Sequence, residues 1–290
     1  MTSRRLSQLL AFALAALTFW SIVSLPGVVD PEFAGTTYVV LVGMVAVLFA
    51  LSFTVLRFAT AGSTVYWSAD TGAKQVGRIG LMIVVLLGLQ LMAGRILDRF
   101  GVLDTVAAEA LYLLAFTLVP AGFLQVGLVK WPTRLCSASK LKLFVTGVLG
   151  IGAAAAWSYA AVVVAPVEMM SSPIGDWSIR VGSLIVGATA EEVIFRVLLL
   201  TALLDLGESR FQAVFLSSVA FGLMHAPPTL VQSLGSWPLL LEAASAYAPL
   251  FLGQVAIGAF LGVLWLRSGS IVLIALTHTI FNVGTALLYL

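Results

Sequence analysis

Two adjacent glutamates and an arginine interrupt an otherwise apolar stretch of this sequence. Glu191 and Glu192 are followed by Arg196, and only Val, Ile and Phe separate the acids from the base. Residues four apart share one face of a helix, so Glu192 and Arg196 can form an ion pair, whereas Glu191 points about 100° away. The spacing therefore predicts one carboxylate held in a structural pair and a second carboxylate free to act as a general base.

The chain has only two histidines, and both lie in apolar stretches downstream of the glutamates. His225 follows Phe221 by four residues, and His278 precedes Asn282 by four residues. The polar ends of His278 and Asn282 therefore share a helix face. Imidazole can hold or transfer a proton, and amide or imidazole N–H groups can stabilise a developing oxyanion.

Charged side chains at the centre of a membrane helix cost about 2.5–3.5 kcal/mol each on insertion scales, so their presence requires an explanation. A lone intramembrane histidine often only bonds to a neighbouring helix, and a single Glu–Arg pair can be purely structural. Here five ionisable groups and one asparagine fall on four consecutive apolar segments and include every histidine of the chain. This concentration favours a functional polar site.

The elements that must position these residues are membrane helices. The chain has 290 residues, of which 61% are hydrophobic and 10% charged, whereas a soluble domain is about 25% charged. In lipid every backbone polar group must be paired internally, which leaves helices or a closed barrel. Long unbroken apolar runs favour helices. We therefore predict an all-α fold, a polytopic transmembrane helix bundle in a lipid bilayer.

A membrane-spanning helix needs about 20 mostly apolar residues. About nine segments qualify, with eight as the alternative count, and we interpret the first as an uncleaved helix. We divide the chain into N-terminal transmembrane helices at 1–165 and a catalytic helix bundle at 181–290, because the ionisable groups at membrane depth fall in the second part. The predicted spans are 8–29, 36–58, 79–97, 105–129, 143–165, 181–204, 211–226, 247–266 and 270–290, and Pro227 and Pro228 are expected to end the seventh.

Basic residues alternate between the predicted loops. Of the fifteen Lys and Arg residues, eleven fall on the side that holds the N-terminus, three fall on the other side, and Arg196 lies within a span. The positive-inside rule then predicts a cytoplasmic N-terminus in a multi-pass integral membrane protein, in the plasma (inner) membrane if the cell is bacterial. No Lys/Arg cluster is dense enough for nucleic acid, and the single Cys136 excludes an internal disulfide.

Three motifs in this order resemble those of the CPBP family of intramembrane endopeptidases, which includes the type II CAAX prenyl endopeptidases and proteins similar to lysostaphin resistance protein A. They are E-E-x-x-x-R ending at Arg196, F-x-x-x-H ending at His225 and H-x-x-x-N beginning at His278, and the likeness covers about residues 181–287. The resemblance implies hydrolysis of peptide bonds in a membrane protein or a lipidated peptide.

The resemblance also implies roles for the six motif residues. Glu191 would activate water, and His225 would help to hold that water. His278 and Asn282 would donate to the oxyanion, while Glu192 and Arg196 would fix the helix and the electrostatics of the site.

Two alternatives to this interpretation stay open. If a metal ion is present, Glu191, His225 and His278 are the expected ligands, and Zn²⁺ is the expected ion, although the chain has no H-E-x-x-H motif. No cofactor is otherwise expected. The chain could also be a non-catalytic or bacteriocin-immunity-type member of the same family. An ion-coupled transporter ranks third, because transporters commonly carry broken helices in both halves.

Overall fold

The computed structural model describes residues 5–14, 65–69, 72–101, 106–164 and 177–288, together with the single residues 16, 50 and 54. In these residues the chain is helical apart from its connections and one short antiparallel pair, β1 (Trp67–Ser68) with β2 (Thr133–Arg134). The predicted all-α class is therefore confirmed. The helices are α3 (Gly72–Arg99), α4 (Val106–Gln125), α5 (Lys140–Val164), α6 (Trp177–Glu192), the π-helix η3 (Val193–Leu200), α7 (Thr201–Asp205), α8 (Arg210–Leu223), α9 (Ala226–Leu230), the 3-10 turn η4 (Val231–Ser233), α10 (Trp237–Ser268) and α11 (Ile271–Leu288), preceded by a helix at Arg5–Leu14.

Seven of the nine predicted spans coincide with helices, but the count of nine is not confirmed. Among the residues that the structure describes, three helices are long and apolar enough to cross a membrane, at Gly72–Arg99, Lys140–Tyr159 and Leu250–Ser268, and four shorter ones are apolar. The run from α6 through η3 to α7 is continuous, and it carries three charged residues in its interior, at 191, 192 and 196, besides Arg180 near its start and Asp205 at its end. The predicted span 36–58 and most of 8–29 lie outside the described residues.

The seventh predicted span ends earlier than expected. α8 stops at Leu223, and the two prolines that were expected to end it instead lie in the first turn of α9. Proline is tolerated there because the first N–H groups of a helix have no partner within the helix. His225 consequently lies in the junction between two helices and does not belong to the body of α8.

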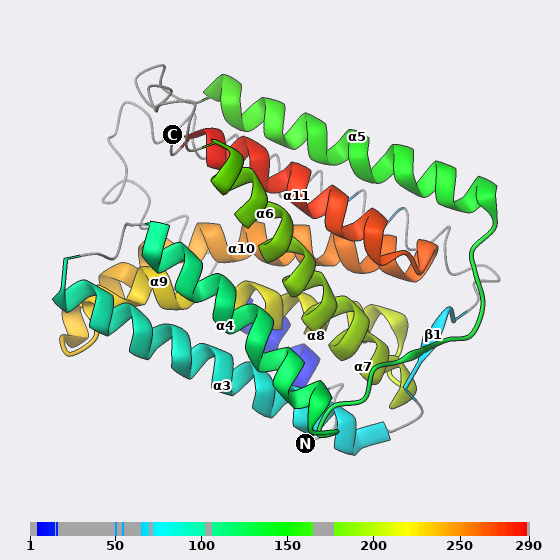
Figure 1. Ribbon diagram of the computed structural model, residues 1–290, viewed down its shortest axis with the longest axis horizontal. Coiled ribbons are helices and arrows are strands. Elements are labelled where there is room, and N and C mark those ends of the chain that lie inside the picture. Colours follow the sequence, from blue (N-terminus) through cyan, green and yellow to red (C-terminus); the bar gives the residue numbers. More distant parts are fainter. Residues whose placement is uncertain are drawn as a thin grey trace.

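The helices pack around a large apolar core, and Val219, Tyr247, Phe251 and Val255 form a second, smaller apolar cluster. α5 and α11 run side by side along one edge of the bundle (Figure 1). Gly147 and Gly150 of α5 face α11, where a side chain on Gly150 would lie 3.0 Å from the hydroxyl of Thr277. Ser158 donates a hydrogen bond to the carbonyl of Ile280. Small residues of this kind let membrane helices approach closely, so α5 fixes the position of α11.

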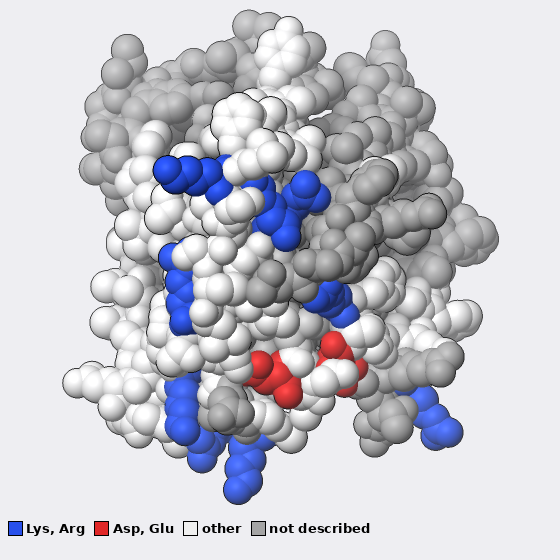
Figure 2. All heavy atoms as spheres, turned by 90° about the vertical axis from the view of Figure 1, so that its right-hand side faces the viewer, with Lys and Arg blue, Asp and Glu red and all other residues white. Residues whose placement is uncertain are grey.

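One end of the bundle, which we call the basic end, is where α3, α5 and α8 begin and α10 terminates (Figure 1). Figure 2 shows Lys and Arg side chains on this face of the molecule. α10 stops at Gly269, whose φ of 57° is left-handed and whose carbonyl accepts a bond from the indole of Trp67. Asp205 accepts from Ser68 and from the amide of Ala69, so β1 is fastened over this end. The basic residues near this end are Lys74 and Arg78 at the start of α3, Lys130 and Arg134 between α4 and α5, Lys140 and Lys142 at the start of α5, Arg210 at the start of α8 and Arg267 at the end of α10.

Candidate active site

The two glutamates stand where the α-helical winding of α6 changes to the π-helical winding of η3. Glu192 is the last residue of α6, and η3 begins at Val193. π-helical turns are rare and often occur at functional sites. Hydroxyl groups satisfy two carbonyls of this segment, because Ser217 of α8 donates to Phe195 and Thr201 donates to Arg196.

The predicted ion pair forms at the centre of the bundle. Nη1 of Arg196 lies 2.7 Å from Oε1 of Glu192, and both side chains are fully buried. The guanidinium also donates from Nη2 to the carbonyl of Gly258 at 3.1 Å and lies 4.4 Å above the ring of Phe221. A buried ion pair is tolerated only when further bonds of this kind compensate for the lost hydration. The pair therefore ties α6, α8 and α10 together.

The same oxygen of Glu192 also contacts the second histidine, which the sequence did not predict. Nδ1 of His278 lies 2.8 Å from Oε1 of Glu192. An ionised carboxylate can only accept, so Nδ1 carries the proton, and Nε2 of a neutral His278 presents a lone pair. Glu192 thus sets the tautomer of the imidazole that faces the other glutamate.

Glu191 lies between the two histidines. Its Oε2 is 3.7 Å from Nε2 of His225 and 3.7 Å from Nε2 of His278, and that oxygen is buried without a hydrogen-bond partner. Nδ1 of His225 bonds to the carbonyl of Phe221 at 2.9 Å, so Nδ1 is again the donor. Both separations exceed hydrogen-bond length. Three acceptors therefore face one another and need a molecule that donates, as water does.

Glu191 and the two histidines beside it differ in the exposed fraction of their side chains. The side chain of His278 is 2% exposed, that of Glu191 is 16% exposed, and that of His225 is 29% exposed. Phe221 packs edge-on against both imidazoles, with its ring centroid 4.8 Å from that of His225 and 5.4 Å from that of His278. The approach to Glu191 is thus from the side of His225.

Asn282 lies one turn beyond His278 on α11 and is half-buried. Five of the six predicted residues therefore contact one another directly or through a shared partner, and Asn282 is next to them on the helix that carries His278. Sequence reasoning missed the carbonyl of Gly258 as the second partner of Arg196, since a backbone acceptor leaves no signal in a side-chain pattern.

The residue types at this site include ligands that zinc accepts in hydrolases, namely one carboxylate and two imidazoles. Within the described part of the chain, however, no group of three His, Cys, Asp or Glu side chains is arranged so that it could hold a metal ion.

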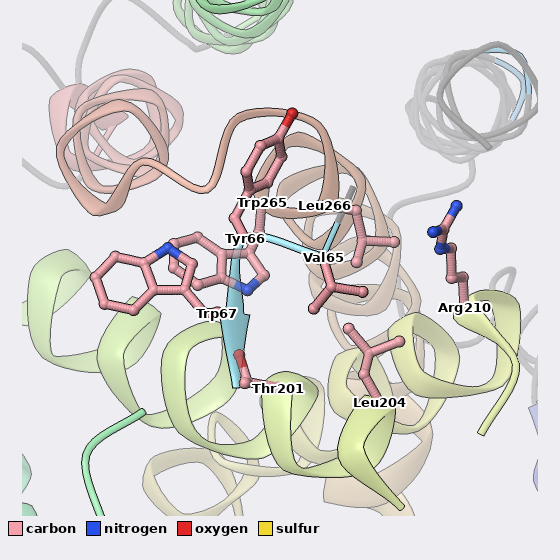
Figure 3. A pocket seen from close by; sticks show the side chains of 8 residues that line it. All are labelled: Val65, Tyr66, Trp67, Thr201, Leu204, Arg210, Trp265 and Leu266. Atoms are coloured by element: carbon pink, nitrogen blue, oxygen red, sulfur yellow. The ribbon is translucent and has the colours of Figure 1, made fainter. Parts of the chain in front are cut away.

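A separate pocket lies at the basic end, where Trp67 stacks on Trp265 with ring centroids 5.7 Å apart (Figure 3). Its other lining residues include Tyr66, Thr201 and Arg210, and none of its eight lining residues belongs to the predicted set. The pocket is therefore distinct from the site around Glu191.

Comparison with known proteins gives one match. Residues 173–284 match the family model described as type II CAAX prenyl endopeptidase Rce1-like. No curated protein and no solved structure matches the chain. The matched segment contains all three motifs and every residue of the site described above, and it confirms the resemblance drawn from the motifs.

Proposed function

Residues 173–284 form a domain of the type II CAAX prenyl endopeptidase Rce1-like family, and from this premise we propose that the chain is an intramembrane endopeptidase. It hydrolyses peptide bonds of membrane-associated substrates with a water molecule activated by Glu191. The observation that carries this proposal is the buried Oε2 of Glu191, which has no hydrogen-bond partner and faces two imidazole nitrogens. A carboxylate in that position can take a proton from water.

The proposed reaction uses these groups in the positions described above. Water loses a proton to Glu191 as its oxygen forms a bond to the carbonyl carbon of the scissile amide, and the carbonyl oxygen becomes an oxyanion. The C–N bond then breaks, and the proton held by Glu191 passes to the leaving nitrogen. The products are a carboxylate and an amine. Nε2 of His225 accepts the second hydrogen of the water and fixes its orientation.

The oxyanion needs hydrogen-bond donors. The side-chain amide of Asn282 supplies one. His278 can supply a second from Nε2 only when both ring nitrogens carry protons, because Nδ1 already donates to Glu192. The donor role that the family resemblance implies for His278 therefore requires the doubly protonated ring, whereas the neutral ring offers an acceptor at Nε2.

The distribution of charge supports a membrane orientation. The basic residues named above gather at one end of the bundle (Figure 2), which the positive-inside rule assigns to the cytoplasm. We therefore propose a multi-pass protein with a cytoplasmic N-terminus, in the plasma membrane if the cell is bacterial. The substrate is then a membrane protein or a lipidated peptide within reach of the bilayer.

The decisive experiment compares the purified wild type with Glu191→Gln on a panel of membrane peptide substrates, with and without a chelator. Glu208→Gln is the matched control, since Glu208 lies in the turn between α7 and α8. We expect the wild type and the control to cleave a peptide both with and without chelator. The cleavage rate should fall about 10²–10⁴-fold in Glu191→Gln. Full activity of Glu191→Gln would refute the role of Glu191, and loss with chelator would replace the water mechanism by a metal one.

A further inference from the structure

Tyr247, in the first half of α10, contacts the helix end that carries His225, although it belongs to none of the three motifs. Its side chain is 7% exposed, and its hydroxyl donates a 2.6 Å hydrogen bond to the carbonyl of Gly222. Gly222 is in the last turn of α8, three residues before His225. A buried tyrosine hydroxyl normally has a partner, but this partner is part of the backbone that directs a site residue.

The carbonyl of Gly222 is the one that the amide of Ala226 would use if α8 continued. It instead accepts the amide of His225 at 3.1 Å together with the hydroxyl of Tyr247, and a carbonyl has lone pairs for both. α8 ends at Leu223, and the two prolines that follow His225 lack the N–H groups with which it could continue. His225 takes φ −91° and ψ −4° in the junction, a region of backbone space that active-site residues often occupy.

Close packing of α10 against α8 makes this bond possible. A side chain on Gly222 would lie 2.8 Å from the ring of Phe251 and 3.0 Å from Val255. Tyr247 packs against Phe251 with ring centroids 6.1 Å apart, one turn further along α10. The tyrosine ring is thus held on its own helix, and only its hydroxyl crosses to α8.

We propose that Tyr247 is a positioning residue for His225. Its hydroxyl fixes the end of α8 in the geometry that directs Nε2 of His225 towards Glu191. The catalytic consequence rests on the proposed peptidase function, whereas the effect on the imidazole of His225 does not. Two measurements therefore separate failure of this inference from failure of the proposed function.

The first measurement is cleavage by Tyr247→Phe, which removes only the hydroxyl. Tyr112→Phe is the matched control, because the hydroxyl of Tyr112 is also buried but has no hydrogen-bond partner. We expect kcat to fall about threefold to tenfold in Tyr247→Phe with KM unchanged, the effect of one lost hydrogen bond, and no change in Tyr112→Phe. In a His225→Ala background, Tyr247→Phe should cause no further fall, because it acts through His225.

The second measurement uses the fact that the chain has only two histidines. Selective nitrogen-15 labelling of histidine gives two ring systems by NMR, and His225→Ala assigns them. We expect Tyr247→Phe to shift or broaden the ring signals of His225 and to leave those of His278 unchanged. Unchanged His225 signals, an effect equal to that of Tyr112→Phe, or losses that add to His225→Ala would overturn the inference. A wild type that cuts no peptide would refute the peptidase instead, and the ring signals would still decide the role of Tyr247.

Discussion

Nδ1 of His278 lies 2.8 Å from Oε1 of Glu192, the oxygen that also holds Arg196 at 2.7 Å. One carboxylate oxygen thus joins the helix that carries both glutamates to α11. Because Glu191 next to it makes no such bond, two adjacent residues of one type have opposite surroundings. These surroundings support the proposed division of roles, in which Glu192 holds the helices together and Glu191 activates water.

The same substitution at the two glutamates should therefore change the stability of the protein by very different amounts. Glu192→Gln leaves a buried guanidinium without its counter-charge, so we expect a loss of about 3–5 kcal/mol in the free energy of unfolding. Glu191→Gln removes no hydrogen bond and should unfold within about 0.5 kcal/mol of the wild type. Thermal unfolding in detergent measures both, and equal destabilisation by the two variants would contradict the assignment.

Asn282→Ala should impair the chemical step. If its amide donates to the oxyanion, kcat should fall about 10²–10³-fold while KM stays near its wild-type value. Thr279→Val is the control on the same helix, because the hydroxyl of Thr279 donates only to the carbonyl of Ala275 on that helix. Steady-state kinetics on one cleaved peptide decide this, and a rise in KM alone would assign Asn282 to substrate binding.

Gly258→Ala should disturb the backbone carbonyl that accepts a hydrogen bond from Arg196. The added carbon would lie 3.1 Å from the Cα of Ser218 and 3.2 Å from the ring of Phe221, and a backbone atom cannot move aside cheaply. We expect a cost of about 1–3 kcal/mol in the free energy of unfolding. Gly253→Ala, on the same helix but facing open space, should not destabilise the protein. A Gly258→Ala variant as stable as Gly253→Ala would show that α10 can shift without loss.

Gly269→Ala should lower the stability of the protein through its effect on the basic end. At φ 57° an added carbon would lie 2.6 Å from Tyr66, so the substitution combines backbone strain with a clash. Gly207 also has a positive φ, of 86°, but faces open space. Gly207→Ala should thus cost about 1–2 kcal/mol from strain alone, and Gly269→Ala about 1–3 kcal/mol more. Chemical or thermal unfolding tests this difference. Equal losses in the free energy of unfolding would mean that Tyr66 and β1 move aside without loss of stability.

Local spacing was sufficient to predict some of the site but not all of it. Glu192 and Arg196 are four residues apart, and that separation brings them together in any helix. The pairing persists although the winding becomes π-helical at Val193. The contact of Glu192 with His278 joins residues 86 positions apart, and such a contact depends on how two helices cross, which no local spacing contains.

The exact ends of the helices were also not predictable from local sequence. Long apolar runs placed seven helices correctly because burial in lipid demands internal hydrogen bonding throughout each run. The hydroxyl of Tyr247 on α10 bonds to the carbonyl of Gly222 in the last turn of α8, and the position of a partner on another helix cannot be predicted from the sequence of α8. The prolines after His225 indicated a break, but their place inside the next helix follows from tertiary packing.

The packing of α5 against α11 has a consequence for how this catalytic unit can be isolated or exchanged. α5 ends at Val164, before the segment 173–284 that the family model matches. A fragment that begins at residue 173 would lack α5, against which Thr277 and Ile280 pack. α11, which carries His278, would then have no neighbouring helix on that side. We therefore expect truncations and chimaeras of this protein to need α5, because the packing of α11 extends beyond the segment that the family model matches.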